Sequence, residues 1–262
     1  MLPLAGSQFP DSPASLAQAL KGGLAQQAME AREVAAAGAW PALDFLKLDL
    51  TGLQISRTHK FPVATTTDAA SFTTASFELR AAPAQWESTP LNVSLRAEQA
   101  AFKFARTADQ QGVLLLARTD RGEVKIEVTR SALEALLHTF AAEAAGKHGV
   151  QIKKTKLEFT SRGPRAVSFR AEVTAKMFLV TAVLCVSGAL DVDDQLNARL
   201  SGLGFSGDGM IASVAGGYIR PQLEKLEGRT FPLLTFAIDE IKLRDIQLEA
   251  GESLRLTAQF GS

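Results

Sequence analysis

The most constraining feature of this sequence is the unbroken alternation of apolar and polar residues from Val167 to Met177. A period of two places alternate side chains on opposite faces of a β-strand, so this segment predicts a strand with one buried face. Residues 151–160 supply an antiparallel partner across a turn at 161–164. From Phe178 to Val186 apolar residues occupy both alternating positions, which predicts a strand covered on both faces.

Two amphipathic helices are expected beside these strands. Ser131 and Glu134 match a capping box, and apolar residues then recur at helical spacing, which predicts a helix over 131–146. The second helix is expected over 210–226. Pro221 lies inside its pattern and should bend it, because proline removes a backbone donor.

The N-terminal half predicts one helix followed by strands. Ser12 and Pro13 suit a helix start, and the helical spacing of leucines and alanines extends the helix over 13–37, with Gly22 and Gly23 as an interruption. Strands are expected between about 45 and 128, at 45–50, 72–80, 91–106, 113–118 and 123–128, with loops at 65–70 and 81–90. Further strands are expected at about 151–206 and, after the last helix, at about 236–260.

Composition excludes several classes of protein. The 262 residues include 28 Lys and Arg and 28 Asp and Glu, and a chain without net charge has no long-range attraction for nucleic acid. A single cysteine, Cys185, excludes an internal disulfide framework and is expected to be buried. The most apolar segment is well short of the roughly 20 residues that span a bilayer, so a soluble protein is expected. The N-terminus lacks a signal-peptide pattern, which indicates a cytoplasmic location, or a periplasmic or envelope one if the N-terminus was processed.

One motif suggests a dinucleotide, because residues 202–207 read Gly-Leu-Gly-Phe-Ser-Gly before a helix. A Rossmann unit needs parallel strands joined by helices, whereas most strands expected here follow one another through short turns. We therefore expect these glycines to form the turn into the helix, with positive φ at Gly204 and Gly207.

A metal site has weaker support. Asp191, Asp193 and Asp194 resemble the opening of a calcium loop, but the later glutamate and central glycine of such a loop are missing, so a solvated hairpin turn is preferred. His59, His138 and His148 have no ligand spacing, and no nucleophile elbow is present. We expect no metal, no cofactor and no catalytic residue.

The order of the C-terminal elements resembles a known family. The capped helix, the hairpin, the apolar strand, Leu190-Asp-Val-Asp-Asp194, the Gly-rich turn, Tyr218-Ile-Arg-Pro-Gln-Leu223, Phe231-Pro-Leu-Leu234 and two closing strands resemble the LmeA-like phospholipid-binding proteins. These are similar to single-module members of the tubular lipid-binding (TULIP) superfamily. The resemblance implies an α+β fold in which a long, highly curved antiparallel β-sheet wraps around amphipathic helices and encloses an apolar tube, as one lipid-binding domain over residues 1–262.

We therefore expect noncatalytic binding, and transfer, of a lipid or phospholipid whose acyl chains lie between helices and sheet. Phenylalanine is abundant (15 residues, against one tyrosine and two tryptophans), which suits an apolar interior. The expected cavity residues are Leu133, Leu136, Leu137, Phe140, Val167, Phe169, Val173, Met177, Ile211, Val214, Tyr218 and Ile219. Leu136, Leu137 and Phe140 should face Val214, Tyr218 or the inner face of the sheet in one chamber. Core residues and cavity walls have the same chemistry, so a filled core explains these side chains equally well.

Two alternatives remain open: a structural or interaction module of the cell envelope with a filled core, and an enzyme that modifies a lipid or uses NAD. The partner expected besides the lipid is a membrane surface, contacted peripherally. The candidate docking residues are Lys153, Lys154, Lys156, Arg162 and Arg165, a basic group around one predicted hairpin. The sequence does not predict an oligomeric state.

Overall fold

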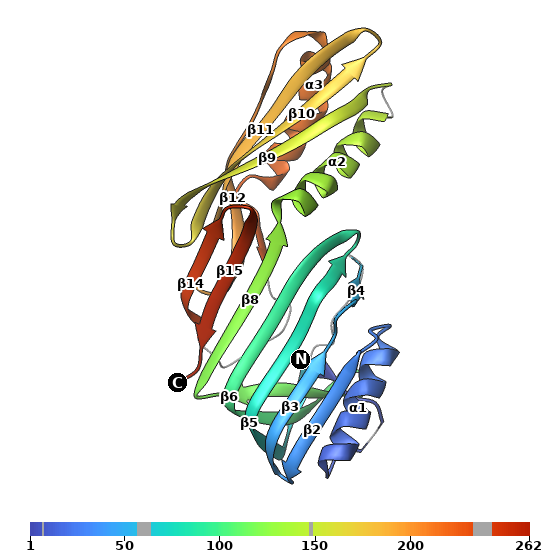
Figure 1. The fold of residues 1–262 in the computed structure, drawn as a ribbon, viewed down its shortest axis with the longest axis vertical. Helices are drawn as coiled ribbons and strands as arrows, with labels where there is room; N and C mark the ends of the chain where they lie inside the picture. Colours follow the sequence, from blue (N-terminus) through green and yellow to red (C-terminus); the bar gives the residue numbers. More distant parts are fainter. Residues whose placement is uncertain (7, 57–63, 147–148, 233–242) are drawn as a thin grey trace. The chain divides into compact units, whose positions relative to one another are not determined.

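The computed structural model describes residues 1–6, 8–56, 64–146, 149–232 and 243–262, which form an α+β fold rich in strands (Figure 1). The chain divides into two compact units, which are described separately below. Unit 1 comprises Met1–Glu127, Leu234–Asp245 and Thr257–Ser262, and unit 2 comprises Val128–Leu233 and Ile246–Leu256. The single domain over 1–262 stays a prediction.

The first sheet is mixed and runs in the order β14-β15-β8-β6-β5-β3-β2, with β7 paired to β6 and β1, and β4 paired to β5. Helix α1 and strands β1 to β7 belong to unit 1, whereas β8, β14 and β15 each have residues in both units. Strand β5 runs parallel to β3 and β4 and antiparallel to β6. The elements are β1 Leu2–Pro3, α1 Pro13–Gln26, β2 Glu33–Ala39, β3 Ala42–Asp49, β4 Gln54–Ile55, β5 Ala64–Trp86, β6 Thr89–Thr107, β7 Gly112–Arg118, β8 Arg121–Thr129, β14 Leu243–Ala250 and β15 Ser253–Phe260.

The core of unit 1 contains buried leucines of α1 and stacked phenylalanines of the sheet. Ser12 caps α1 in a capping box with Ser15, as expected for the helix start, and the leucine stripe of α1 at Leu16, Leu20 and Leu24 is fully buried. Phe72 and Phe102 stack with ring centroids 5.2 Å apart. Helix α1 therefore buries its leucine stripe completely in the core of unit 1.

Helix α1 passes through Gly22 and Gly23 without interruption, contrary to expectation. The two glycines serve a close approach instead, because a Cβ at Gly23 would lie 2.5 Å from the carbonyl carbon of Pro3 and 2.7 Å from Cα of Leu4. Strand β1 thus lies directly against the helix backbone.

The helix predicted over 13–37 is wrong beyond Gln26, since β2 spans Glu33–Ala39. Alanine by itself favours a helix, and antiparallel pairing with β3 overrides that preference in favour of the strand. The loops predicted at 65–70 and 81–90 are also wrong. Strand β5 runs through Ala64–Trp86 because β6 offers it a long antiparallel partner, and only Glu87 and Ser88 connect the two.

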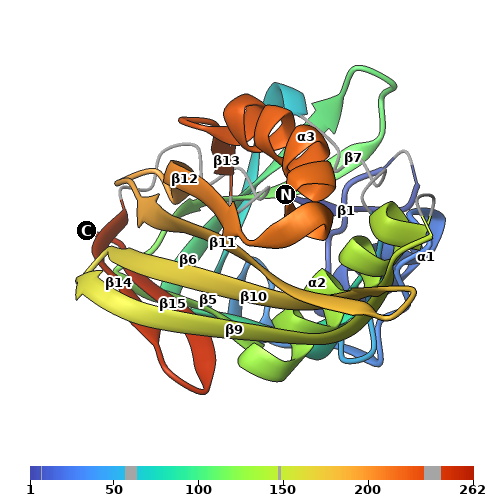
Figure 2. The ribbon, with the colours of Figure 1, turned by 90° about the horizontal axis from the view of Figure 1, so that it is seen from above.

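Unit 2 contains the second sheet, in the order β13-β12-β11-β10-β9, with antiparallel neighbours throughout (Figure 2). Its elements are α2 Arg130–Gly146, β9 Gln151–Gly163, β10 Ala166–Met177, β11 Val180–Val192, β12 Asn197–Gly207, α3 Gly209–Leu226 and β13 Thr230–Pro232. Both predicted helices and the β9–β10 hairpin are confirmed. Helix α3 continues past Pro221, and Gly228 follows it with φ of 69°.

Two local expectations in unit 2 are wrong. The hydroxyl of Thr129, not Ser131, accepts a hydrogen bond from the N–H of Ala132 at the start of α2, and Glu134 is used elsewhere, so no capping box forms. The segment after β10 is not covered on both faces. Leu184 is buried, and Cys185 is buried as expected, but Phe178 and Leu179 form a turn in solvent. Among the described residues no helix is long and apolar enough to cross a membrane.

Candidate functional site

Helix α2 covers the free edge of the second sheet. Strand β9 is the last strand of that sheet, so the outward backbone groups of β9 have no strand partner among the described residues. The carboxylate of Glu134 accepts a hydrogen bond from the N–H of Leu157 at 2.8 Å, and Nδ1 of His138 lies 3.3 Å from the hydroxyl of Thr155. These polar contacts fix α2 beside β9 and protect the edge.

Helix α3 packs on β11 and β12 through small residues. A Cβ at Gly207 would lie 3.0 Å from Cβ of Ala212, and a Cβ at Gly216 would lie 3.1 Å from the ring of Phe205. Ile211 and Ala212 are buried in a core cluster with Val173, Ala175 and Leu184. The helix therefore approaches the sheet closely near its N-terminus.

The predicted cavity residues are brought together only in part. Val173 and Ile211 share the buried cluster, and Met177 packs against it. Of the others, Val167 is buried, Leu133, Leu136, Leu137, Phe169 and Ile219 are half-buried, and Phe140, Val214 and Tyr218 are exposed. The exposed members lie on an open apolar face of α2 and α3, not in the walls of a closed chamber.

Helices α1 and α2 carry similar apolar stripes and use them differently. Leu16, Leu20 and Leu24 of α1 are fully buried, whereas in α2 Ala132 alone among the described residues is buried and Phe140 is 47 % exposed. Apolar surface left open on a helix that is already docked is typical of a binding surface.

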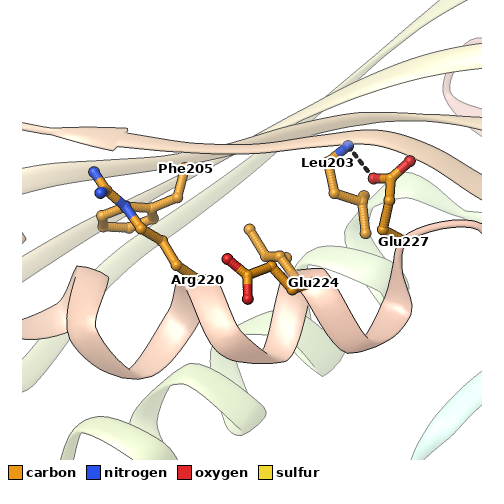
Figure 3. Close-up of a pocket in the computed structure, with 6 residues that line it drawn as sticks. Leu203, Phe205, Arg220, Glu224 and Glu227 are labelled. Carbon is orange, nitrogen blue, oxygen red and sulfur yellow. Dashed lines mark hydrogen bonds between the residues drawn. The ribbon is translucent and has the colours of Figure 1, made fainter.

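A hollow of about 240 Å³ lies between β12 and the second half of α3 (Figure 3). Its lining residues are Leu203, Phe205, Arg220, Leu223, Glu224 and Glu227. It is smaller than the roughly 300–1,000 Å³ that is usual for small-molecule pockets. None of these residues was predicted, although positions 220, 223, 224 and 227 have the spacing of one helix face.

One of the charged side chains that line this hollow, Glu227, forms hydrogen bonds with the backbone of β12. The two oxygens of Glu227 accept hydrogen bonds from the N–H groups of Gly202 and Leu203, at 2.9 and 2.8 Å. The guanidinium of Arg220 lies 5.9 Å from the centre of the Phe205 ring. Glu227 therefore anchors the end of α3 to β12, while Arg220 and Glu224 remain on the rim beside an apolar wall (Figure 3).

The glycine motif lies inside β12, and the expected turn into the helix is wrong. Gly202 has φ of 60°, but Gly204 and Gly207 do not have positive φ and pair with β11 in a strand. Gly209 has φ of 80° and makes the turn into α3. No strand–crossover–strand unit surrounds the motif in the described part of unit 2, so its geometry is not that of a dinucleotide loop.

The aspartates at 191–194 belong to the β11–β12 connection. Oδ1 of Asp193 accepts hydrogen bonds from the N–H groups of Gln195 and Asn197, each at 2.8 Å, and Asp194 pairs with Arg165. Burial acts to raise the pKa of Asp193, but the hydrogen bonds outweigh it and hold that pKa below its ordinary value. Within the described ranges no group of acidic, histidine or cysteine side chains could hold a metal ion. His59 and His148 lie outside the described residues.

The basic candidates do not form one patch. Lys153 and Lys154 lie at the start of β9, and Arg162 lies at its far end, about 30 Å away at the rise of an extended strand. Lys156 pairs with Glu158, which raises the pKa of Lys156 and lowers that of Glu158 through their hydrogen bond. Arg165 is engaged by Asp194.

Comparison with known proteins gives no match to a family model, a curated protein or a solved structure.

Proposed function

We propose that this protein binds a lipid without catalysis, and that the acyl chains lie along the open apolar faces of α2 and α3 in unit 2. The observation that supports this most directly is the incomplete burial of the α2 stripe beside the complete burial of the α1 stripe. Covering half-exposed apolar side chains with an acyl chain gains about 25 cal/mol for each Å² removed from water.

The surroundings of these faces suit a ligand with one polar end. The hollow beside α3 offers an apolar wall of Leu203, Phe205 and Leu223, and the charged groups Arg220 and Glu224 stand at its rim. A chain can lie on the wall while a polar headgroup stays in water near the rim. A long curved sheet of the tubular lipid-binding kind, and transfer of the bound lipid, are part of the same proposal.

The test compares two phenylalanines of similar exposure. Phe140 on α2 is 47 % exposed and Phe45 on β3 of unit 1 is 40 % exposed. Native mass spectrometry of the purified protein should show a bound amphiphile in fixed stoichiometry, and delipidated protein should bind cis-parinaric acid saturably. We expect Phe140→Asp to weaken that binding at least about tenfold, because a carboxylate would enter the contact with the chain.

Phe45→Asp should leave binding unchanged, since Phe45 lies on β3 of unit 1 and the proposed surface consists of α2 and α3 of unit 2. If wild type, Phe140→Asp and Phe45→Asp bind the probe alike, the proposed surface is wrong. If delipidated wild type binds no probe and no lipid copurifies, a filled interaction module is the better description.

A further inference from the structure

The turn between β10 and β11 is the most exposed apolar feature among the described residues. Met177 pairs with Val180, so Phe178 and Leu179 alone form the connection. Their side chains are 89 % and 94 % exposed. Two large apolar side chains thus project into solvent from the end of a hairpin.

Turn chemistry does not explain these residues. Phe178 has φ of 54°, in the left-handed region where glycine is favoured and where a bulky residue is strained. The β5–β6 hairpin makes a connection of the same length, with φ of 56° at Glu87, and uses Glu87 and Ser88. Equivalent backbone geometry is therefore achieved with polar residues elsewhere in this chain.

Other two-residue connections between strands agree with this contrast. Three of them, Thr119-Asp120, Pro164-Arg165 and Gly251-Glu252, are largely polar. Trp40-Pro41 is apolar, but the Trp40 ring packs on Phe72 with centroids 5.4 Å apart. Phe178 and Leu179 have no such cover.

The end of the β10–β11 hairpin extends beyond the neighbouring strand β12. The last residue of β12, Gly207, pairs with Leu184, so β11 extends from Leu184 to Val180 beyond the end of β12. This overhang amounts to about 13 Å at the rise of an extended strand. Val180 and Val183 in the overhang are about half exposed. The end of the hairpin is therefore a projecting apolar tip.

The charge beside the tip is positive. Residues 149–154 and 174–183, which form the adjoining ends of β9, β10 and β11, contain Lys153, Lys154 and Lys176 and no aspartate or glutamate. Lys176 pairs across the sheet with Gln151 and Thr181. The acidic residues Glu143 of α2 and Asp208 before α3 belong to the elements that start or end nearby.

We infer that this tip, Phe178 to Val180, inserts into the surface of a bilayer that carries anionic phospholipids, with Lys153, Lys154 and Lys176 meeting the headgroups. An apolar end with cations on the adjoining strands β9 and β10 matches the two layers of such a surface, with hydrocarbon below and phosphate above. A membrane surface extends the lipid-binding function proposed above. Docking is measured independently of ligand uptake, so either can fail alone.

The first experiment is cosedimentation with vesicles of phosphatidylcholine alone and of phosphatidylcholine mixed with phosphatidylglycerol. The tip variant is Phe178→Gly with Leu179→Ser, because glycine tolerates the positive φ and the hairpin is retained. We expect wild type to bind the mixed vesicles and the tip variant to lose at least about tenfold in affinity. The control is Trp86→Ser, which removes a 47 % exposed aromatic beside the β5–β6 turn and should bind as wild type.

A second variant separates charge from insertion. Changing Lys153, Lys154 and Lys176 to glutamine should weaken binding at low salt and have little further effect at high salt, where headgroup attraction is screened. Insertion itself is read from Phe178→Trp, whose fluorescence should shift to the blue and be quenched by brominated acyl chains.

Equal binding of wild type and tip variant to mixed vesicles would overturn the inference, and so would wild-type protein that binds neither kind of vesicle. Concentration-dependent self-association of wild type that the tip variant loses, without vesicle binding, would assign the tip to a contact between copies of the chain. Copurifying lipid together with failed vesicle binding would leave the proposed function intact and remove the docking tip.

Discussion

The sharpest test of the packing in unit 1 is the substitution Gly23→Ala. A Cβ at position 23 would lie 2.5 Å from the carbonyl carbon of Pro3 and closer still to its oxygen, and 2.7 Å from Cα of Leu4. These are backbone atoms that cannot rotate away. Strand β1 is held in place by pairing with Leu114 and Val113 of β7, and by the hydrogen bond from the N–H of Ala5 to the carbonyl of Ala19 at 2.8 Å.

The two terms in this substitution oppose each other. Alanine is better than glycine in a helix interior by about 1 kcal/mol. Overpacking against fixed atoms costs about 1–3 kcal/mol, and the rigid position of β1 places this site at the upper end. We expect Gly23→Ala to lower the free energy of unfolding by about 2 kcal/mol.

The matched control is Gly217→Ala in α3. A Cβ at Gly217 meets no atom within 4 Å, so only the helix preference remains and the variant should be more stable by about 0.5–1 kcal/mol. Substitution by alanine should thus lower the free energy of unfolding at Gly23 and raise it at Gly217, although both glycines lie inside helices. Gly23→Ala that is as stable as wild type, or more stable, would refute the close approach of β1.

Urea unfolding measures both variants. The two tryptophans, Trp40 and Trp86, belong to unit 1, so fluorescence reports on that unit while circular dichroism reports on all helices and strands. Coincident transitions, with Gly217→Ala shifting both signals, would support one domain over 1–262. If Gly217→Ala leaves the midpoint of the fluorescence transition unchanged, the two units unfold separately.

Two further predictions concern unit 2. Gly207→Ala should destabilise by about 1–2 kcal/mol in urea, because its Cβ would crowd Ala212, Leu184 and the carbonyl of Val183, whereas Gly204→Ala, which meets only the Ser187 hydroxyl at 3.3 Å, should stay within about 0.5 kcal/mol. Saturable binding of a nicotinamide nucleotide that either variant abolishes would contradict the structural role of both glycines. The lowered pKa of Asp193 means that its carboxylate stabilises the fold above its ordinary pKa of about 4, and that this stability is lost as the pH falls through the lowered value. Asp193→Asn should therefore be less stable than wild type at pH 7, and melting curves should converge below about pH 4; a constant difference across that range would contradict the assignment.

Strong periodicity in the sequence was enough to predict much of unit 2. The alternation from Val167 to Met177 predicted β10 and its hairpin with β9, and the helical stripes predicted α2 and α3 to within one residue at each end. These signals are local, because spacing alone decides which face of a strand or helix is apolar. Where the local signal was misleading, as in the alanines of 33–39, which favour a helix, pairing with the next strand, β3, decided the structure instead.

The candidate site depended on information that the sequence does not contain. The stripes of α1 and α2 look alike in the sequence, and only the packing of the chain buries one and leaves the other open. The apolar run after β10 looked like a buried strand, yet Phe178 and Leu179 are solvent-exposed because the chain reverses at that point. Arg220 and Glu224 meet Phe205 of β12 in the hollow only when α3 docks on the sheet. The sequence by itself determined which residues are apolar and with what period; tertiary structure decided which of them are covered, because burial depends on residues far apart in the chain.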